Sequence, residues 1–231
     1  MTNFNIEIVS DTVCPWCYVG HKQLTKAIAT YRAAHPDSND TFSTTWKPFY
    51  LDPDAPKVGI EKSERYAAKF GPERTQAIFQ RLGQVGQAVG INFKFGGKTG
   101  NTRDSHRLIQ LGKTKSPEVQ TKVVEALFAA YFENEQDITS HDVLLAAAKK
   151  AGLDEAEVKR WLESDEGGKQ VDAEVAEAQE RMISGVPHFT LNDRFEVEGA
   201  QDSTAFVRLF ERLKKMEGDD AVAKVEVGSK C

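Results

Sequence analysis

Two cysteines lie close together near the start of the chain, in the stretch DTVCPWCYVG at residues 11–20. They are Cys14 and Cys17, and the whole sequence of 231 residues contains three cysteines. So few cysteines are typical of a reducing compartment, where a close pair is more often catalytic or metal-binding than structural. If the pair is catalytic, its chemistry is thiol–disulfide exchange, in which a thiolate attacks the sulfur of a disulfide.

The position of the pair at the start of a predicted helix favours this chemistry. Unpaired backbone N–H groups and the positive end of the helix dipole would stabilise a thiolate on Cys14. Cys17 lies one turn further on, so we expect it to be less exposed and to resolve a mixed disulfide. Pro15 is compatible with the first helical turn, and Trp16 would offer an apolar surface to substrates. We therefore expect an exposed and reactive Cys14.

A zinc site, a haem attachment site and a structural pair each fit the sequence less well. Zinc could use Cys14, Cys17 and His21, but no fourth ligand is evident, so we expect neither a metal nor a tightly bound cofactor. Covalent haem attachment requires a histidine directly after the second cysteine, where this sequence has Tyr18. A buried structural pair would be expected within a periodic core segment, whereas these cysteines follow the end of a predicted strand.

The composition is that of an ordinary globular protein, with 40% hydrophobic and 28% charged residues. The net charge of −5 is spread along the chain, which argues against a general nucleic-acid binder. The first residues contain no basic region followed by an apolar stretch, so they do not resemble a secretory signal. No apolar run is long enough to span a membrane. We therefore expect a cytoplasmic protein with neither nucleic acid nor membrane as a partner.

The pattern around the cysteines predicts a strand, a helix and a second strand. Apolar and polar residues alternate over residues 4–9, which predicts the first strand. Helical spacing of apolar residues follows from the cysteines to about residue 36, where His35-Pro36 would end the helix. Residues 42–52 predict the second strand. The cysteine pair thus lies at the first turn from strand to helix.

The middle of the chain has helical periodicity from about residue 61 to about residue 183, so we expect a large all-helical segment there. Ser116, followed by Pro117, and Asp154 are predicted to cap two of its helices. Residues 188–191 and 195–197 then predict a β-hairpin, followed by an amphipathic helix that ends near residue 217. The tail at 218–231 is polar, and we expect it to be loosely ordered.

Without the helical segment, the order of elements is βαβ followed by ββα, which is the order of a thioredoxin fold. We therefore expect an α/β protein whose thioredoxin-fold domain comprises residues 1–60 and 184–217, with residues 61–183 inserted as a helical domain. A second motif fits this order. In ISGVP, Val186-Pro187 opens a strand shortly after a glycine, a position at which proline is tolerated.

Five stretches together carry a resemblance to a known family: SDTVCPWCYVG, WKPFYLDPDAP, NTRDSHRLI, ISGVP and VEGAQ. The chain resembles DsbA-family thioredoxin-fold oxidoreductases of the FrnE type, from residue 6 to about residue 213. The resemblance implies a DsbA-like fold, dithiol–disulfide exchange and a cis-proline loop facing the cysteines. It also implies protein or small-molecule thiols and disulfides as substrates. The residues that match the family's site are Cys14, Pro15, Trp16, Cys17, Val186 and Pro187.

Related folds leave other functions open. Kappa-class glutathione transferases and 2-hydroxychromene-2-carboxylate isomerases are similar, bind glutathione and usually carry serine at the position of Cys14. Both cysteines are present here, which favours redox chemistry, with glutathione as a possible co-substrate. Asp202, in GAQD, could contact the γ-glutamyl group of glutathione, or it could cap the last helix. A non-catalytic binding module or chaperone is the remaining hypothesis.

Four other polar residues are candidates for contact with a substrate. Asn101, Thr102 and His106 lie at the start of a predicted helix, and in the family that segment covers the active site. The alternative is that Asn101 or Thr102 simply caps the helix. His188 follows Pro187 directly and could stabilise a thiolate as an imidazolium, or strand alternation could point it elsewhere.

Overall fold

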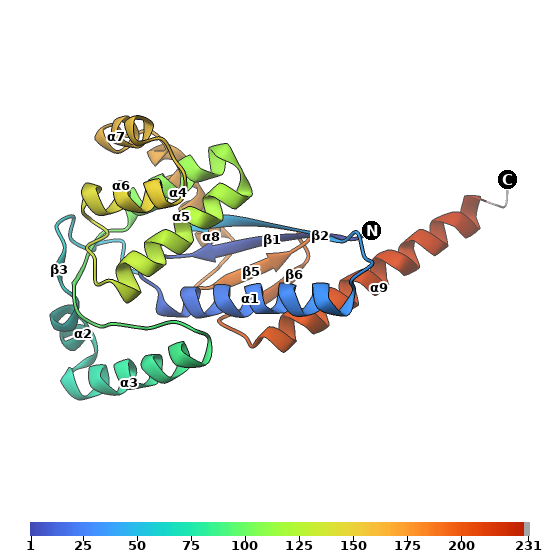
Figure 1. Ribbon diagram of the computed structural model, residues 1–231, viewed down its shortest axis with the longest axis horizontal. Helices are drawn as coiled ribbons and strands as arrows, with labels where there is room; N and C mark the ends of the chain where they lie inside the picture. The colour runs from blue at the N-terminus through green and yellow to red at the C-terminus, as the bar shows by residue number, and fades with distance from the viewer. Residues whose placement is uncertain (229–231) are drawn as a thin grey trace.

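The computed structural model describes the chain from residue 1 to residue 228, and its side chains from residue 1 to residue 216. The central sheet has four strands in the order β2-β1-β5-β6. β1 (Asn3–Ser10) and β2 (Thr41–Pro48) are parallel, whereas β5 (His188–Leu191) is antiparallel to both β1 and β6 (Phe195–Glu198). This is the thioredoxin-fold arrangement that the sequence predicted (Figure 1).

Two helices pack against each other along one face of the sheet, α1 (Pro15–Ala34) and α9 (Ser203–Gly228) (Figure 1). The sheet is apolar on this face because apolar residues alternate with polar ones along β1. Phe4 of β1 contacts Tyr31 of α1 and Phe210 of α9, with ring centroids 5.3 and 5.1 Å apart. These contacts anchor α1 on the sheet, so its first turn is held at the end of β1.

The segment between β2 and β5 folds mainly as helices, several of which contact β2. They are α2 (Lys62–Phe70), α3 (Pro72–Ala88), α4 (Arg103–Lys115), α5 (Pro117–Phe128), α6 (His141–Lys150), α7 (Glu155–Glu163) and α8 (Gly168–Glu180). The segment departs from an all-helical one in two details. Short strands β3 (Ile60–Glu61) and β4 (Lys98–Thr99) pair antiparallel, and a π-helical turn, η1 (Ala129–Glu133), follows α5. In the described part of the chain, no helix is long and apolar enough to cross a membrane.

Most helix boundaries fall where the sequence predicts them. The side chains of Ser116 and Asp154 each accept a hydrogen bond from a backbone N–H of the following first turn, as expected for N-caps. The last helix differs, because α9 continues to Gly228 instead of ending near residue 217. Residues 229–231, which include Cys231 and the end of the predicted loose tail, lie outside the described residues.

The sheet and the inserted segment share one apolar core. Tyr18 of α1 stacks on Phe128 at the end of α5, with ring centroids 5.0 Å apart. The Tyr18 hydroxyl donates a hydrogen bond to Glu133 of η1 at 2.6 Å. Trp46 of β2 is buried, and its Nε1–H donates to Thr121 of α5 at 3.0 Å. These contacts hold the inserted segment against the start of α1, so residues far apart in the sequence meet around the cysteines.

Candidate active site

Cys14 occupies the N-cap position of α1. Its backbone is extended, with φ −89° and ψ 112°, and Pro15 is the first helical residue, as predicted. The N–H of Cys14 donates to the carbonyl of Asp11 at 3.0 Å, and the N–H of Cys17 donates to the carbonyl of Cys14 at 3.1 Å. No side chain caps this helix. The Cys14 sulfur is therefore next to the positive end of the α1 dipole.

The two cysteines differ in what surrounds their sulfurs. Both are reduced and both are buried, with 3% of Cys14 and 1% of Cys17 exposed. The expectation of an exposed Cys14 is wrong, because residues of the inserted segment cover it. Cys14 nevertheless lines a cavity of about 390 Å³, and Cys17 does not. Burial raises the pKa of the Cys17 thiol well above its usual value, and the hydrogen bond and charge of Cys14 raise it further.

The loop before β5 lies against Cys14, as the family resemblance implied. The peptide bond between Val186 and Pro187 is cis. The Cys14 thiol donates a hydrogen bond to the carbonyl oxygen of Val186, with 3.5 Å between sulfur and oxygen. Gly20 of α1 permits this close approach, since a Cβ atom there would lie 3.0 Å from the side chains of both Pro187 and Phe189. The loop and β5 can therefore pack directly on the helix that begins with the cysteine pair.

The cavity at Cys14, called the cysteine cavity below, has two walls. The sheet wall comes from the cysteine turn and the loop before β5, and consists of Val13, Cys14, Pro15, Trp16, Gly185 and Val186. The inserted wall comes mainly from α2, α3 and η1, and its apolar and aromatic residues are Tyr66, Phe70, Ile78, Leu82 and Tyr131. Charged side chains also line the cavity, among them Arg65, which pairs with Asp52, and Lys69.

Sequence reasoning did not assign the residues of the inserted wall to the site. Tyr66 lies near the Cys14 sulfur, and burial, followed by the charge of Cys14, raises the pKa of Tyr66 to about 12. The Tyr131 hydroxyl donates to Thr99 Oγ1 at 2.8 Å, which fixes the orientation of its ring. Helical periodicity indicates that such residues are buried, but it carries no signal for the distant residue against which they pack.

A buried cation supports this wall. Lys62 is 3% exposed, and its Nζ lies 3.8 Å from the centre of the Tyr131 ring. The same Nζ donates to the backbone carbonyl of Tyr131 at 3.1 Å. Burial lowers the pKa of Lys62 to about 8, and the charge of Glu135 opposes that shift only in part. The cation–π contact and the hydrogen bond offset some of the cost of removing the ammonium from water.

Three of the predicted substrate-contact residues do not line the cysteine cavity. Asn101 Oδ1 accepts from the backbone N–H of Arg103, the first residue of α4, at 2.9 Å, whereas Thr102 holds the N-cap position and its side chain makes no capping hydrogen bond. Thr102 is buried, and its carbonyl accepts from the N–H of His106 at 3.0 Å. His106 is buried as well, with its Nε2 3.1 Å from the carbonyl oxygen of Phe49 in the loop after β2. These contacts are structural ones within the inserted segment and with the loop after β2.

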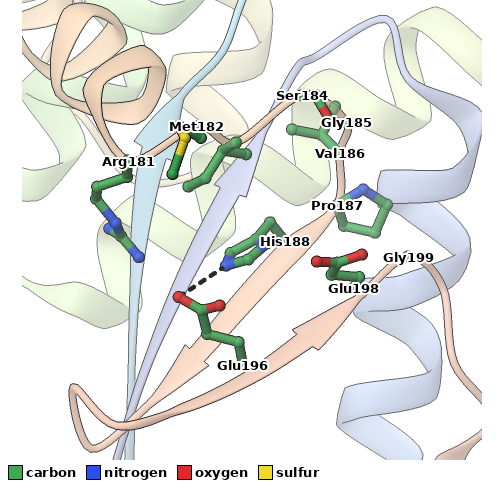
Figure 2. Close-up of a pocket in the computed structure, with 11 residues that line it drawn as sticks. Arg181, Met182, Ser184, Gly185, Val186, Pro187, His188, Glu196, Glu198 and Gly199 are labelled. Carbon is green, nitrogen blue, oxygen red and sulfur yellow. Dashed lines mark ion pairs between the residues drawn. The ribbon is translucent and has the colours of Figure 1, made fainter.

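The other two candidates also lie outside the cysteine cavity. His188 lines a second cavity, in which its Nε2 faces Glu196 at 3.7 Å (Figure 2). Strand alternation therefore turns it away from Cys14, the alternative that the sequence left open. Asp202 is exposed, and its Oδ1 accepts from the N–H of Thr204 at 2.9 Å in the first turn of α9. This is the contact of a helix cap.

The residues considered for a zinc site have other partners. His21 Nε2 lies 2.8 Å from Glu125 of α5, and its ring packs against Trp46 at 5.2 Å between centroids. These contacts commit His21 to the packing between α1 and the inserted segment. Within the described residues, no group of three or more histidine, cysteine or acidic side chains is arranged to hold a metal ion.

Comparisons with known proteins match nearly the whole chain. Residues 5–211 match the family described as DSBA-like thioredoxin domain. The uncharacterized protein YwbO of Bacillus subtilis (strain 168) is 27% identical over 206 residues, which cover 87% of this chain and 93% of that protein. The crystal structure of the probable DsbA oxidoreductase SCO1869 from Streptomyces coelicolor is 30% identical, with a TM-score of 0.82 over 92% of this chain and 90% of that one.

Two more distant solved structures share the fold. A 2-hydroxychromene-2-carboxylate isomerase is 16% identical, with a TM-score of 0.67 over 93% of this chain and 98% of that one. The cytosolic disulfide reductase DsbM from Pseudomonas aeruginosa, in a structure with GSH, is 12% identical, with a TM-score of 0.57 over 94% of this chain and 98% of that one. At these identities the likeness is one of fold alone.

Proposed function

The chain belongs to the family of DsbA-like thioredoxin domains, and from this premise we propose that it is a thiol–disulfide oxidoreductase acting through Cys14 and Cys17. The observation that carries the proposal is the unequal setting of the pair. Cys14 lines a cavity, whereas Cys17 is buried away from that cavity and its pKa is raised. An attacking thiol has to be reachable by substrate, and a resolving thiol has to stay unreactive until a mixed disulfide has formed.

The proposed reaction has two steps. In the first, the Cys14 thiolate attacks one sulfur of a substrate disulfide, and the bond between the two substrate sulfurs breaks as a mixed disulfide forms. In the second, the Cys17 thiolate attacks the Cys14 sulfur, which releases the remaining substrate thiol and leaves a Cys14–Cys17 disulfide. The substrate gains two electrons and two protons, and the cysteine pair loses them. A dithiol or glutathione reduces the pair again, and oxidation of a substrate dithiol is the reverse sequence.

The residues around the pair have defined roles in this proposal. Val186 orients the Cys14 sulfur through its carbonyl oxygen, and Pro187 has no N–H that could compete at the site. Pro15 and Trp16 form the part of the sheet wall next to the sulfur. The apolar inserted wall receives the group that flanks the substrate sulfur and excludes water from the reacting atoms.

We propose glutathione as a co-substrate rather than a bound cofactor. Lys69 lines the cysteine cavity and forms no ion pair with a carboxylate among the residues that the structure describes. An anionic tripeptide would find a counter-charge at that position. We also propose the cytoplasm as the compartment, where a reducing glutathione poise favours net reduction or isomerisation of disulfides. A transferase or isomerase that uses the glutathione thiol is the second candidate, and Lys69 is the residue that favours it.

Reduction of insulin disulfides, measured with and without glutathione, tests the proposal. We expect the wild type and the control Cys231→Ser to be active, and Cys14→Ser and Cys17→Ser each to lose nearly all activity. Loss with Cys14→Ser alone, together with dependence on glutathione, would support the single-thiol route. Full activity of both variants would contradict any role of the pair, and absence of activity in the wild type would leave a binding module as the function.

A further inference from the structure

A second cavity, of about 400 Å³, lies next to the loop that carries Val186 and Pro187. It shares Gly185 and Val186 with the cysteine cavity, but neither cysteine lines it. Its lining comes from the loop at residues 181–187 that follows α8, from the strands β5 and β6, and from Gly199 (Figure 2). The mechanism proposed above makes no use of this space, which we call the loop cavity.

One imidazole nitrogen in the wall of the loop cavity has no hydrogen-bond partner. His188 is 5% exposed, and its Nε2 has no hydrogen-bond partner. The nearest carboxylate oxygen is Glu196 Oε1 at 3.7 Å, too far for a hydrogen bond. Figure 2 shows the ring and the carboxylate facing each other across this gap. Buried polar atoms are normally paired, so an unpaired one in the wall of a cavity indicates the position of a ligand atom.

The charge of the loop cavity is negative. Glu196 and Glu198 belong to its lining, and neither forms an ion pair with a lysine or arginine in the part of the chain that the structure describes. Arg181 is the lining's only permanent cation among the described residues, and it is already engaged. Its guanidinium donates to Glu7 at 2.5 Å and to Thr190 at 2.9 Å. Two carboxylates are therefore left without a counter-charge beside the imidazole.

These features select one class of ligand. An anion would be repelled by Glu196 and Glu198, and an apolar group would leave the His188 nitrogen unpaired. The described residues also contain no cluster of three side chains suited to a metal ion. A primary ammonium fits, because it carries a positive charge and three N–H donors. One N–H can donate to Glu196 while another donates to the His188 Nε2 of a neutral imidazole.

We propose that the loop cavity binds the ammonium group of a lysine side chain that lies near the reacting cysteine of a polypeptide substrate. The inference rests on the proposed function, because the lysine is placed by the mixed disulfide with Cys14. Val186 connects the two sites. Its carbonyl oxygen accepts a hydrogen bond from the Cys14 thiol, and Val186 also lines the loop cavity. The two cavities share Gly185 and Val186, so a polypeptide joined to Cys14 lies beside the loop that also lines the loop cavity.

A binding experiment tests the cavity without any redox step. The probe is n-butylammonium, followed through the imidazole ¹⁵N resonances of the protein, with those of His188 assigned from a His188→Gln variant. We expect a saturable shift of the His188 Nε2 resonance. Glu196→Gln/Glu198→Gln should weaken binding by roughly tenfold or more, and Glu163→Gln, a distant exposed control, should not. The single variant Glu196→Gln serves if the double variant is unfolded. No shift, or an equal shift with tetramethylammonium, which has no N–H donor, overturns the site.

A kinetic experiment tests the substrate role. Disulfide-linked peptides carry lysine or norleucine at each of the two positions on either side of the cysteine. At the best position, we expect kcat/KM to favour lysine by about tenfold at low salt. We expect Glu196→Gln/Glu198→Gln to abolish this preference and the control Glu163→Gln to retain it. Equal rates for both peptides in the wild type overturn the lysine subsite. If the lysine preference is absent and spermidine binds the loop cavity more tightly than the lysine peptide does, the occupant is a free polyamine.

The two proposals fail in different ways. If the wild type exchanges disulfides with neither peptide, the oxidoreductase function falls and the substrate role of the loop cavity falls with it. The n-butylammonium titration then still decides whether His188 and Glu196 form an ammonium site. If both peptides react but the titration shows no binding, the oxidoreductase function stands and the ammonium site is rejected.

Discussion

The two walls of the cysteine cavity are held in place by different kinds of contact. In the sheet wall, the cysteine turn is fixed by short-range backbone geometry, because Cys14 is an N-cap residue whose N–H donates to a carbonyl three residues earlier, and the loop at Val186 packs on that turn. The inserted wall is held by contacts between side chains that are distant in the sequence, such as the cation–π contact of Lys62 with the Tyr131 ring. Local geometry therefore places the Cys14 sulfur, whereas long-range packing shapes the cavity beside it. Under the proposed function, we expect changes in the inserted segment to alter which substrate is accepted and to leave the disulfide exchange itself in place.

The largest expected effect tests whether the sheet wall alone supplies the reactive thiol. We expect brief iodoacetamide labelling of the reduced protein near neutral pH to modify Cys14 at least roughly tenfold faster than Cys17, because only Cys14 lines the cavity and burial raises the pKa of Cys17. Mass-spectrometric peptide mapping measures the ratio, with free glutathione as the reference thiol. Preferential labelling of Cys17 would reverse the two roles.

The next prediction concerns the inserted wall and the pKa of Lys62. Burial holds that pKa near 8 in the folded protein, against a usual value of 10.5. Between these pH values the unfolded chain binds the extra proton, so the free energy of unfolding rises with pH across this window. Relative to Lys62→Met, we expect the wild type to gain roughly 2–3 kcal/mol between pH 7 and pH 10.5. Urea titrations of both proteins measure the difference at each pH, and a constant difference would contradict the buried ammonium.

A matched pair of glycine substitutions compares the two walls directly. Gly20→Ala places a methyl group 3.0 Å from Pro187 and Phe189, so we expect the free energy of unfolding to fall by roughly 1–2 kcal/mol and disulfide exchange to slow as the loop shifts from Cys14. Gly83→Ala, in α3 behind the inserted wall, meets nothing within 4 Å. We expect it to raise the free energy of unfolding by about 0.5–1 kcal/mol. Equal stability of both variants in urea would show that the loop adjusts freely.

The same division explains what the sequence could predict. The strand–helix–strand unit, the caps at Ser116 and Asp154, the hairpin and the cysteine turn all follow from residues close together in the chain. The cis bond at Val186–Pro187 followed from the family resemblance, which carried a long-range relation that periodicity cannot give. These predictions are confirmed because each depends on local geometry or on a motif whose residues stand unchanged in this chain.

The failures at the candidate site concern the distant residues against which a side chain packs. Cys14 is buried because α2 and α3 fold over it, and no feature of CPWC indicates that cover. His106 and Thr102 start a helix as predicted, yet they point into the packing behind the cavity. Tyr66 has the spacing of an ordinary helical residue, and only the fold brings it next to the sulfur. Amphipathic patterns identify a buried face but not the partner of that face.

The smallest expected effect lies outside both walls, at Asp202, where the sequence left a glutathione contact and a helix cap open. The structure gives Asp202 the contact of a cap, since its carboxylate accepts from the N–H of Thr204. We expect Asp202→Ala to lower the free energy of unfolding by less than Gly20→Ala does. Asp202→Asn should retain most of the wild-type stability, because an amide oxygen also caps well. Neither should change the KM for glutathione.

The pH dependence separates the two Asp202 roles further. Hydrogen bonding to the Thr204 backbone lowers the pKa of Asp202 below its usual value of 3.8. The stabilisation is therefore present above that usual value and is lost as the pH falls through the lowered one, and Asp202→Asn should show no such loss. Thermal melts from pH 2 to pH 7 and glutathione titrations measure both effects. A raised KM for glutathione in both variants, with unchanged melting, would mean that Asp202 binds the γ-glutamyl group and that the substrate site extends beyond the two walls.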